Sequence, residues 1–137
     1  WRWLKLRKSS SPHALGRRGE ALAARYVKRR GMRIVARGKR LRPGELDLVA
    51  VDGGTIVFIE VKTRTSTEAG HPVLAVDANK QQRLTRLALA YLKGHGLLEY
   101  PARFDVVAIT WPEQGSSPEV EYFENAFEAT DRGQMFS

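Results

Sequence analysis

The pattern of apolar and polar positions predicts two helices. In the first, apolar residues recur every three or four positions from Pro12 to about Arg30, and Gly31 ends it. The second begins after Asp77, whose side chain suits a helix N-cap, and ends near Gly94. Its apolar stripe has the spacing of an amphipathic helix: Leu84, Leu87, Ala88, Tyr91 and Leu92. Each helix therefore has one face to bury against another element.

Apolar runs and alternating segments predict five strands around these helices. They cover residues 32–41, 44–52, 55–64, 102–110 and 119–127. The basic residues of the first suggest a sheet edge or a surface that faces substrate, and the strongly apolar fourth is expected to be central. We expect Val73–Val76 to be a short strand or extended segment. The order of elements indicates an α/β fold, a mixed β-sheet flanked by helices. The second helix is then a crossover that places the fourth strand parallel to the third.

The second and third strands form one hairpin, from Gly44 to Arg64. Gly53-Gly54 suits a two-residue turn, which sets Asp52 opposite Thr55. Because side chains alternate along a strand, one face of this hairpin is apolar near the turn. The apolar residues of that face are Val49, Val51, Ile56 and Phe58. The far end of the same face is charged.

At the charged end, the register predicts Asp47 opposite Glu60 and Glu45 opposite Lys62. Like charges directly opposite each other destabilise a sheet, so Asp47 and Glu60 favour a cation between them. The alternative is an ion pair between Glu45 and Lys62, with the other two acids in solvent. However, the third strand is apolar on its opposite face as well, which indicates burial, and buried acids need partners. We therefore favour a divalent metal site.

Three blocks of sequence resemble a known family, in the order GELDLV, FIEVKTR and RFDVV. Asp47 and, thirteen positions later, Glu60-Val61-Lys62 are similar to the acid…E-x-K core of the PD-(D/E)XK nuclease superfamily. The three blocks together more closely resemble the small bacterial YraN-type endonuclease-like family, related to the archaeal Holliday-junction resolvases. The similarity extends from about Ala14 to Ile109. Leu46 stands where the superfamily name has Pro, a residue that carries no chemistry.

The resemblance implies a restriction-endonuclease-like core and a Mg²⁺- or Mn²⁺-dependent endonuclease that hydrolyses phosphodiester bonds. By the same resemblance, Asp47, Glu60 and the Val61 carbonyl would bind the metal. Lys62 would position or help to deprotonate the attacking water, and would offset charge on the phosphate. Glu45 has the least defined role, and would hold Lys62 in place.

Glu20 is an acid on the inward face of the first helix. It precedes Ala23, Ala24 and Val27 by three, four and seven positions, so it shares their face. It lies past the first helical turn, so the helix dipole explains little. A salt bridge to Arg17 is the alternative. In the resembling family a helix acid at this position lies beside the metal site, so Glu20 is a catalytic candidate that would orient a water or bind the metal directly.

Four further residues are candidates for substrate contact. Lys80 and Gln81 lie in the first turn of the second helix, where a helix N-terminus attracts phosphate and a Lys strengthens the attraction. A solvated Lys at a helix start is the alternative, but the resemblance, through KQQR, favours the rim of the site. We also expect Arg64 and Arg40 to bind substrate.

Two other polar features are expected to be structural. Arg103 and Asp105 alternate on one side of the fourth strand, and an ion pair is the default for them. His71 is a lone histidine in a loop, for which we expect no catalytic role.

The net charge of +8 is distributed unevenly along the chain. Residues 1–42 contain 15 Lys or Arg against one acid, whereas residues 113–137 contain one against six. A block this basic is an electrostatic footprint for a polyanion, and we expect nucleic acid, in particular DNA, as the partner. The alternatives are a solubilising surface without specificity and an anionic membrane. The membrane is the weaker of these, since Trp1 and Trp3 are the only aromatic anchors in the N-terminal arm.

Composition bounds the domain organisation and the compartment. A chain of 137 residues with 42% hydrophobic content suits one nuclease-like domain over residues 14–137, after a flexible basic arm over residues 1–13. The absence of cysteine excludes disulfides, Cys-ligated zinc and a thiol nucleophile. No apolar run approaches the ~20 residues of a membrane span, and no signal peptide is evident. We therefore expect a cytoplasmic protein without membrane partners.

Two function classes remain, a metal-dependent endonuclease and a non-catalytic nucleic-acid-binding module that keeps the nuclease fold. The complete acid-acid-lysine set favours the enzyme, because a pure binding module has no reason to hold these residues in register. The sequence leaves the substrate open among junction, flap, nicked and single-stranded DNA and RNA. Junction resolution needs two active sites and would therefore require a homodimer.

Overall fold

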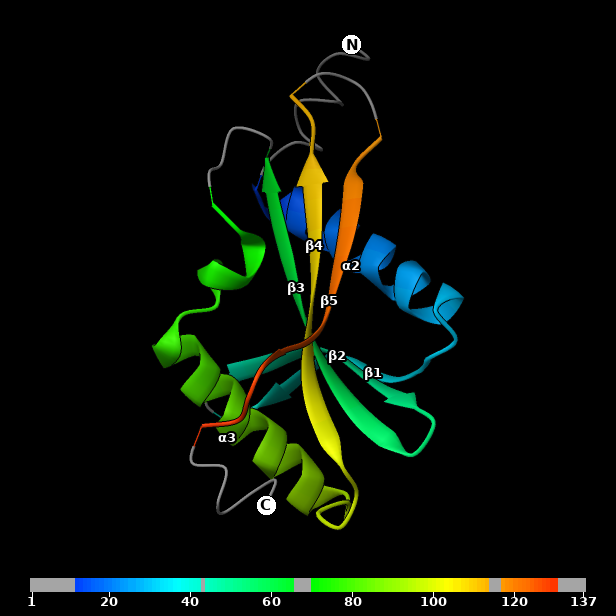
Figure 1. The fold of residues 1–137 in the computed structure, drawn as a ribbon, viewed down its shortest axis with the longest axis vertical. Coiled ribbons are helices and arrows are strands. Elements are labelled where there is room, and N and C mark those ends of the chain that lie inside the picture. The colour runs from blue at the N-terminus through cyan, green and yellow to red at the C-terminus, as the bar shows by residue number, and fades with distance from the viewer. Residues whose placement is uncertain (1–11, 43, 66–69, 114–116, 131–137) are drawn as a thin grey trace.

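The computed structural model describes residues 12–42, 44–65, 70–113 and 117–130. The basic arm expected over residues 1–13 lies almost wholly outside this part of the chain. The described part folds into a five-stranded sheet with one long helix packed on each face (Figure 1). The predicted α/β fold is confirmed, and the arrangement is consistent with a restriction-endonuclease-like core.

The helices and strands begin and end close to the predicted residues. Helix α2 covers Pro12–Arg29, and Gly31 directly after it has a φ of +93°, which glycine adopts without strain. Helix α3 covers Ala78–Gly94, and Asp77 caps it by accepting a hydrogen bond from the Lys80 amide at 2.9 Å. Neither helix is both long and apolar enough to cross a bilayer. The strands are β1 (Arg33–Leu41), β2 (Gly44–Asp52), β3 (Thr55–Thr65), β4 (Ala102–Trp111) and β5 (Glu119–Phe127).

The strands lie in the order β1-β2-β3-β4-β5. All neighbours are antiparallel except β3 and β4, which are parallel and joined through α3, as predicted. β1 is an edge strand and β4 an interior strand, which also confirms the prediction. This order places β2 and β3, which carry the candidate acids, between the basic β1 and the apolar β4.

The sheet buries apolar side chains on both faces. On one face Phe58 of β3 packs with the stripe of α3, and on the other Ile59 packs with the stripe of α2. Both side chains are 2% exposed. β3 is therefore covered on both faces, as its continuous apolar run predicted. Glu60, the charged residue at the end of this run, is consequently buried as well.

The hairpin register is confirmed for five pairs from the turn, the last of which joins Leu48 to Ile59. The ladder ends there, so the predicted pairing of Asp47 with Glu60 does not form. Beyond this point β3 continues beside β4, whereas the remaining part of β2 continues beside β1. The two strands thus diverge after the pair of Leu48 with Ile59. Figure 1 shows β2 and β3 running in different directions.

The segment expected to be a strand or an extended approach at Val73–Val76 is instead a 3₁₀ helix, η1 (Pro72–Ala75). Its first residue is a proline, which has the backbone angle of a helix start and lacks the amide hydrogen that a strand needs. Nδ1 of His71 accepts a hydrogen bond from the Val73 amide at 3.3 Å. His71 therefore caps this short helix.

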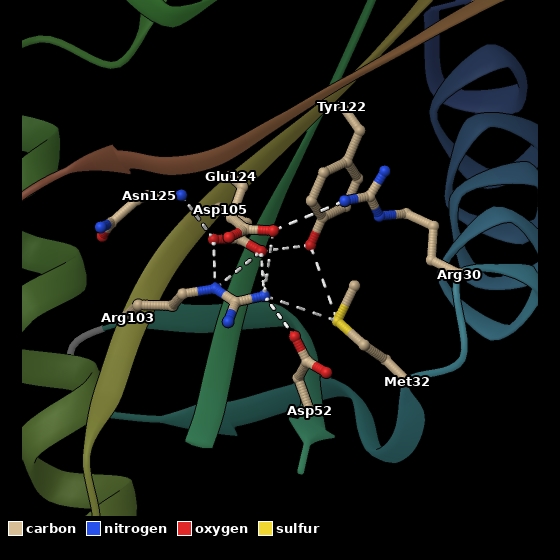
Figure 2. A network of polar contacts seen from close by, with 8 residues as sticks. All are labelled: Arg30, Met32, Asp52, Arg103, Asp105, Tyr122, Glu124 and Asn125. Atoms are coloured by element: carbon tan, nitrogen blue, oxygen red, sulfur yellow. Dashed lines mark hydrogen bonds and ion pairs between the residues drawn. The ribbon is translucent and has the colours of Figure 1, made fainter. Parts of the chain in front are cut away.

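Asp105 on β4 is fully buried and bonded to several donors (Figure 2). Nε of Arg103 lies 3.0 Å from its Oδ1, and the Asn125 amide donates to the same oxygen at 2.8 Å. The Tyr122 hydroxyl donates to Oδ2. The guanidinium of Arg103 also lies 3.0 Å from Asp52 at the end of β2. The predicted structural ion pair between Arg103 and Asp105 is confirmed, within a larger network.

Candidate metal centre

Asp47 lies at a bend shared by β1 and β2. Leu46 packs on the α3 side of the sheet and Leu48 on the α2 side, although residues two apart in a regular strand share a face. Gly38 lies at the same step of β1, between the residues paired with these two leucines, and has a φ of +54°. This left-handed conformation favours glycine. The bend takes Asp47 out of the regular ladder.

The Asp47 carboxylate reaches β3 through its side chain. Its Oδ2 accepts a hydrogen bond from the Val61 amide at 2.9 Å, where a regular hairpin would have a backbone bond. This contact holds Asp47 beside Glu60, the residue that ends the buried run of β3. The predicted proximity of Asp47 and Glu60 is therefore present, but a side-chain bond rather than strand pairing produces it.

Helix α2 approaches β3 closely enough to add a further carboxylate. A Cβ atom on Gly19 would lie 2.3 Å from Oγ1 of Thr63 on β3, so a larger residue does not fit there without a shift. The next residue along the helix is Glu20. One carboxylate oxygen each of Glu20, Glu45 and Asp47 lies within 4.8 Å of the other two. The close approach at Gly19 thus brings Glu20 of α2 near Glu45 and Asp47 of β2.

Glu45 belongs to this acidic group and not to a pair with Lys62. The predicted Glu45–Lys62 pairing is wrong, because β2 leaves β3 before the register reaches these residues. Instead, the Glu45 carboxylate lies 3.8 Å from Nε of Arg40, an exposed and weak contact. The salt bridge of Glu20 with Arg17, considered from the sequence, is not found among the described residues.

Two of these acids, Asp47 and Glu20, have a raised pKa. The pKa of Asp47 is raised from 3.8 to about 8, first because burial disfavours its charged form and then because the Glu60 charge is near. The hydrogen bond from the Val61 amide acts in the opposite direction. The pKa of Glu20 is also raised, by burial first and then by the charges of Glu45 and Glu60. A cation among these carboxylates would offset both the desolvation and the repulsion.

Lys80 and Gln81 lie at the site but differ in what they contact. Nζ of Lys80 lies 2.5 Å from Oε2 of Glu60. The Gln81 side chain donates to the Val76 carbonyl at 2.9 Å. Lys80 is therefore placed at the acids, whereas the amide of Gln81 is committed to the backbone before α3.

The other predicted basic residues lie on both sides of the acids. Lys62 is half-buried on β3, two residues after Glu60, and has no ion pair or hydrogen bond to another side chain within the described ranges. Arg64 donates to Oγ1 of Thr110 at 3.2 Å and to the Gly70 carbonyl, which fixes its guanidinium. Arg40 has a side chain that is 90% exposed. Lys62 and Arg40 are thus the less restrained of the three cations.

The donor set suits a hard divalent cation. Carboxylate oxygens of α2 and β2 converge, and Glu60 of β3 lies beside Asp47. Oxygen ligands are those that Mg²⁺, Mn²⁺ and Ca²⁺ prefer. Glu60 already has a positively charged partner, the Lys80 ammonium group, which shows that a cation fits beside this carboxylate. The side chains present therefore fit a metal ion.

The acids near Asp47 include more than the set expected from the sequence. The sequence pointed to Asp47, Glu60 and the Val61 carbonyl as ligands, and Glu60 does lie beside Asp47. The group of three described carboxylates whose oxygens lie within 4.8 Å of one another adds Glu20 and Glu45 to Asp47. The sequence reasoning gave Glu45 no ligand role because it assumed a regular strand. An isolated glycine in a strand pattern, such as that of β1, signals a bulge or bend and could have revealed it.

Comparisons with known proteins cover most of the chain. The model of the uncharacterised protein family UPF0102 matches residues 19–109, which include the acids of α2, β2 and β3. A UPF0102 protein of Rhodopirellula baltica is 49% identical over 118 residues, which are 84% of this chain and 71% of the relative. A relative from Geobacter metallireducens is 48% identical, over 84% of this chain and 93% of its own length. One from Geobacter sulfurreducens is 50% identical, over 83% and 88%. The chain belongs to the UPF0102 family.

Proposed function

We propose that the chain is a metal-dependent endonuclease of the PD-(D/E)XK superfamily, related to the archaeal Holliday-junction resolvases, that hydrolyses phosphodiester bonds in DNA. The observation that carries this proposal is the acidic group around Asp47, whose pKa is raised to about 8. Asp47 is partly buried among like charges, which disfavours its charged form unless a cation balances it, and perturbed carboxyls cluster at functional sites. Branched DNA is among the candidate substrates.

In this proposal, Asp47 and Glu60 hold a Mg²⁺ or Mn²⁺ ion, with the Val61 carbonyl as a third protein ligand. Glu20 and Glu45 lie close enough to Asp47 to ligate as well or to orient a water. When bound, the ion would neutralise charge on the phosphate and lower the pKa of the attacking water. The bond from the Val61 amide to Asp47 fixes the carboxylate and so supports a ligand with defined geometry.

Lys62 is the proposed partner of the attacking water and of the phosphate. It follows Glu60 on β3, and no described carboxylate neutralises it. An ammonium group in this position can orient a water and offset the negative charge that develops in the transition state. Lys80, Gln81 and Arg64 would contact the substrate from the rim, with Arg40 on the β1 side.

The surface charge supports approach of a polyanion from the β1 side of the sheet. Exposed basic residues cover the outer side of α2 and the edge strand β1: Arg17, Arg18, Arg25, Lys28, Arg29, Arg33, Arg37 and Arg40. At the opposite edge, β5 exposes Glu119, Glu121 and Glu124. The acids of β2 lie next to the basic edge, so DNA attracted there would reach the candidate metal centre.

The test is a cleavage assay with Mg²⁺ on linear, nicked, flapped, single-stranded and four-way-junction DNA, and on RNA. We expect Asp47→Asn, Glu60→Gln and Lys62→Gln each to lower the cleavage rate by at least about 10²-fold while DNA binding is retained. Glu121→Gln is the matched control, because it removes an exposed acid from the opposite edge of the sheet. Cleavage retained by Asp47→Asn would contradict the site assignment.

The competing function is a non-catalytic nucleic-acid-binding module, which the basic surface supports equally well. Calorimetric titration with Mg²⁺ or Mn²⁺ separates the two. Ion binding that disappears in the double variant Asp47→Asn/Glu60→Gln supports the enzyme. No ion binding by the wild-type protein, without DNA and then with DNA, would favour the binding module.

A further inference from the structure

Glu60 has a protein cation as its partner. Its side chain is only 8% exposed, and Nζ of Lys80 lies 2.5 Å from its Oε2. A buried carboxylate needs a partner, and the Lys80 ammonium group is the partner of Glu60. A divalent ion that uses the same oxygen would therefore compete with the Lys80 ammonium for Glu60.

Lys80 is fixed at its backbone, and its ammonium group is held by a single ion pair. Its amide donates to the Asp77 side chain, which caps α3. Its side chain is 29% exposed and has no second ion-pair partner in the described part of the chain. A lysine side chain carries its ammonium group on a flexible stem of four carbons, so the ammonium can leave Glu60 while the helix stays in place. Gln81, in contrast, is held by its bond to the Val76 carbonyl.

We infer that Lys80 is a displaceable counter-ion. It neutralises Glu60 when no metal is bound, and it turns toward the substrate phosphate when a divalent cation takes Glu60. This inference rests on the proposed function, because it requires a cation at Glu60. It makes metal binding and phosphate binding cooperative, since the ion releases the ammonium that the phosphate needs. By linkage, DNA must raise the affinity for the ion by the same factor.

The direct test measures the reactivity of lysine amines on the wild-type protein. Acetylation by an N-hydroxysuccinimide ester is followed by mass spectrometry, with and without Ca²⁺ or Mg²⁺. We expect labelling of Lys80 to rise about threefold or more with the ion, because the amine then loses its ion pair with Glu60 and becomes more exposed. Lys93, an exposed residue about 20 Å away along α3, is the internal control and should not change.

The outcomes of this test separate the inference from the proposed function. If calorimetry shows a bound ion and Lys80 labelling is unchanged, the displacement is wrong and the metal site stands. If calorimetry shows no bound ion, the metal site and the displacement both fail.

A pair of variants tests the competition independently. We expect Lys80→Gln to raise the affinity for Ca²⁺ about tenfold, because the competing charge is lost, and Lys93→Gln to leave it unchanged. Lys80→Arg keeps the competitor and should stay near the wild-type value. Thermal unfolding of each variant establishes that it is folded. Equal or weaker ion binding by folded Lys80→Gln would overturn the inference.

The same variants report the cooperativity. With a duplex DNA as the probe, Ca²⁺ should increase DNA affinity in the wild-type protein and in Lys93→Gln, and the increase should shrink in Lys80→Gln. An undiminished increase in Lys80→Gln would show that the released ammonium does not bind phosphate.

Discussion

Asp47 and Asp105 lie on the two strands that flank β3, and their surroundings are opposite. Asp105 is fully buried, and Arg103, Tyr122 and the Asn125 amide all donate to it. Asp47 accepts one bond from a backbone amide and is otherwise bracketed by acids. The fold therefore supplies several donors to Asp105, whereas Asp47 receives one donor and its charge would have to be neutralised by a proton or a bound cation.

The difference shows how a structural acid is told from a candidate ligand. The bonds to Asp105 come from β5 and from the Arg103 guanidinium of β4, which also contacts Asp52 of β2, so they tie the sheet together (Figure 2). The Asp47 group gathers like charges, which opposes folding unless a cation is present. The charge of the neighbouring groups, rather than burial alone, therefore separates the candidate ligand from the structural acid.

The largest effect on stability is expected from breaking the hydrogen-bond network around Asp105. Asp105→Ala would leave the mostly buried guanidinium of Arg103 without its main partner, and we expect it to lower the free energy of unfolding by about 3–5 kcal/mol. Urea denaturation measures this loss. Asp52→Ala removes a partly exposed partner of the same guanidinium and should cost less than about 1 kcal/mol. Equal losses in the two variants would contradict the special role of Asp105.

The second prediction concerns Asp47 and the dependence of the free energy of unfolding on pH. The pKa of Asp47 is raised from 3.8 to about 8 in the folded state, so its proton is held more tightly there than in the unfolded chain. Its contribution to stability is full below pH 4 and is lost as pH rises to 8. With EDTA present, we expect the free energy of unfolding to fall by about 2 kcal/mol over this range, an amount reduced for solvent screening.

Asp47→Asn is the control for this pH dependence. It keeps an oxygen to accept the Val61 bond but cannot ionise, so its unfolding free energy should lack the fall attributed to Asp47. Added Mg²⁺ at pH 8 should stabilise the wild-type protein and not the variant. Parallel pH profiles for the two proteins would refute the assignment of this titration to Asp47.

The smallest effect is expected from removing one donor of the satisfied acid. Tyr122→Phe deletes the hydroxyl that donates to Asp105 and leaves the bonds from Arg103 and the Asn125 amide. We expect a loss of about 1 kcal/mol in the free energy of unfolding. Tyr100→Phe, on a side chain that is 48% exposed, is the matched control and should be neutral. A neutral Tyr122→Phe would show that its hydroxyl adds nothing to the network.

Local signals predicted the elements of this fold well. The Asp77 cap, the stop at Gly31 and the Gly53-Gly54 turn each depend on a few neighbouring residues, and the structure has all three. The short segment at Pro72–Ala75 was misjudged, because four apolar residues do not distinguish a strand from a helical turn. Local chemistry therefore defines where elements begin and end.

The candidate site depended on geometry that local signals do not contain. Helix periodicity pointed Glu20 toward the strand acids, and one of its carboxylate oxygens does lie near those of Glu45 and Asp47, although the residue is exposed. Glu45 was misplaced because regular alternation was extended through the bend at Asp47 and Gly38. The Lys80–Glu60 contact depends on how α3 docks on the sheet, which the sequence pattern does not specify.

The separation of β2 from β3 also bears on the order of folding. The last pair of that hairpin joins residues 11 positions apart, whereas β3 and β4 pair residues 46 apart. Short loops close before long ones, so Asp47 and Glu60 should meet early, and Glu20 and Lys80 should arrive when the helices dock. An ion that needs the complete site would then bind after the rate-limiting step. We expect Mg²⁺ to slow unfolding and to leave the folding rate nearly unchanged, which stopped-flow measurements can resolve.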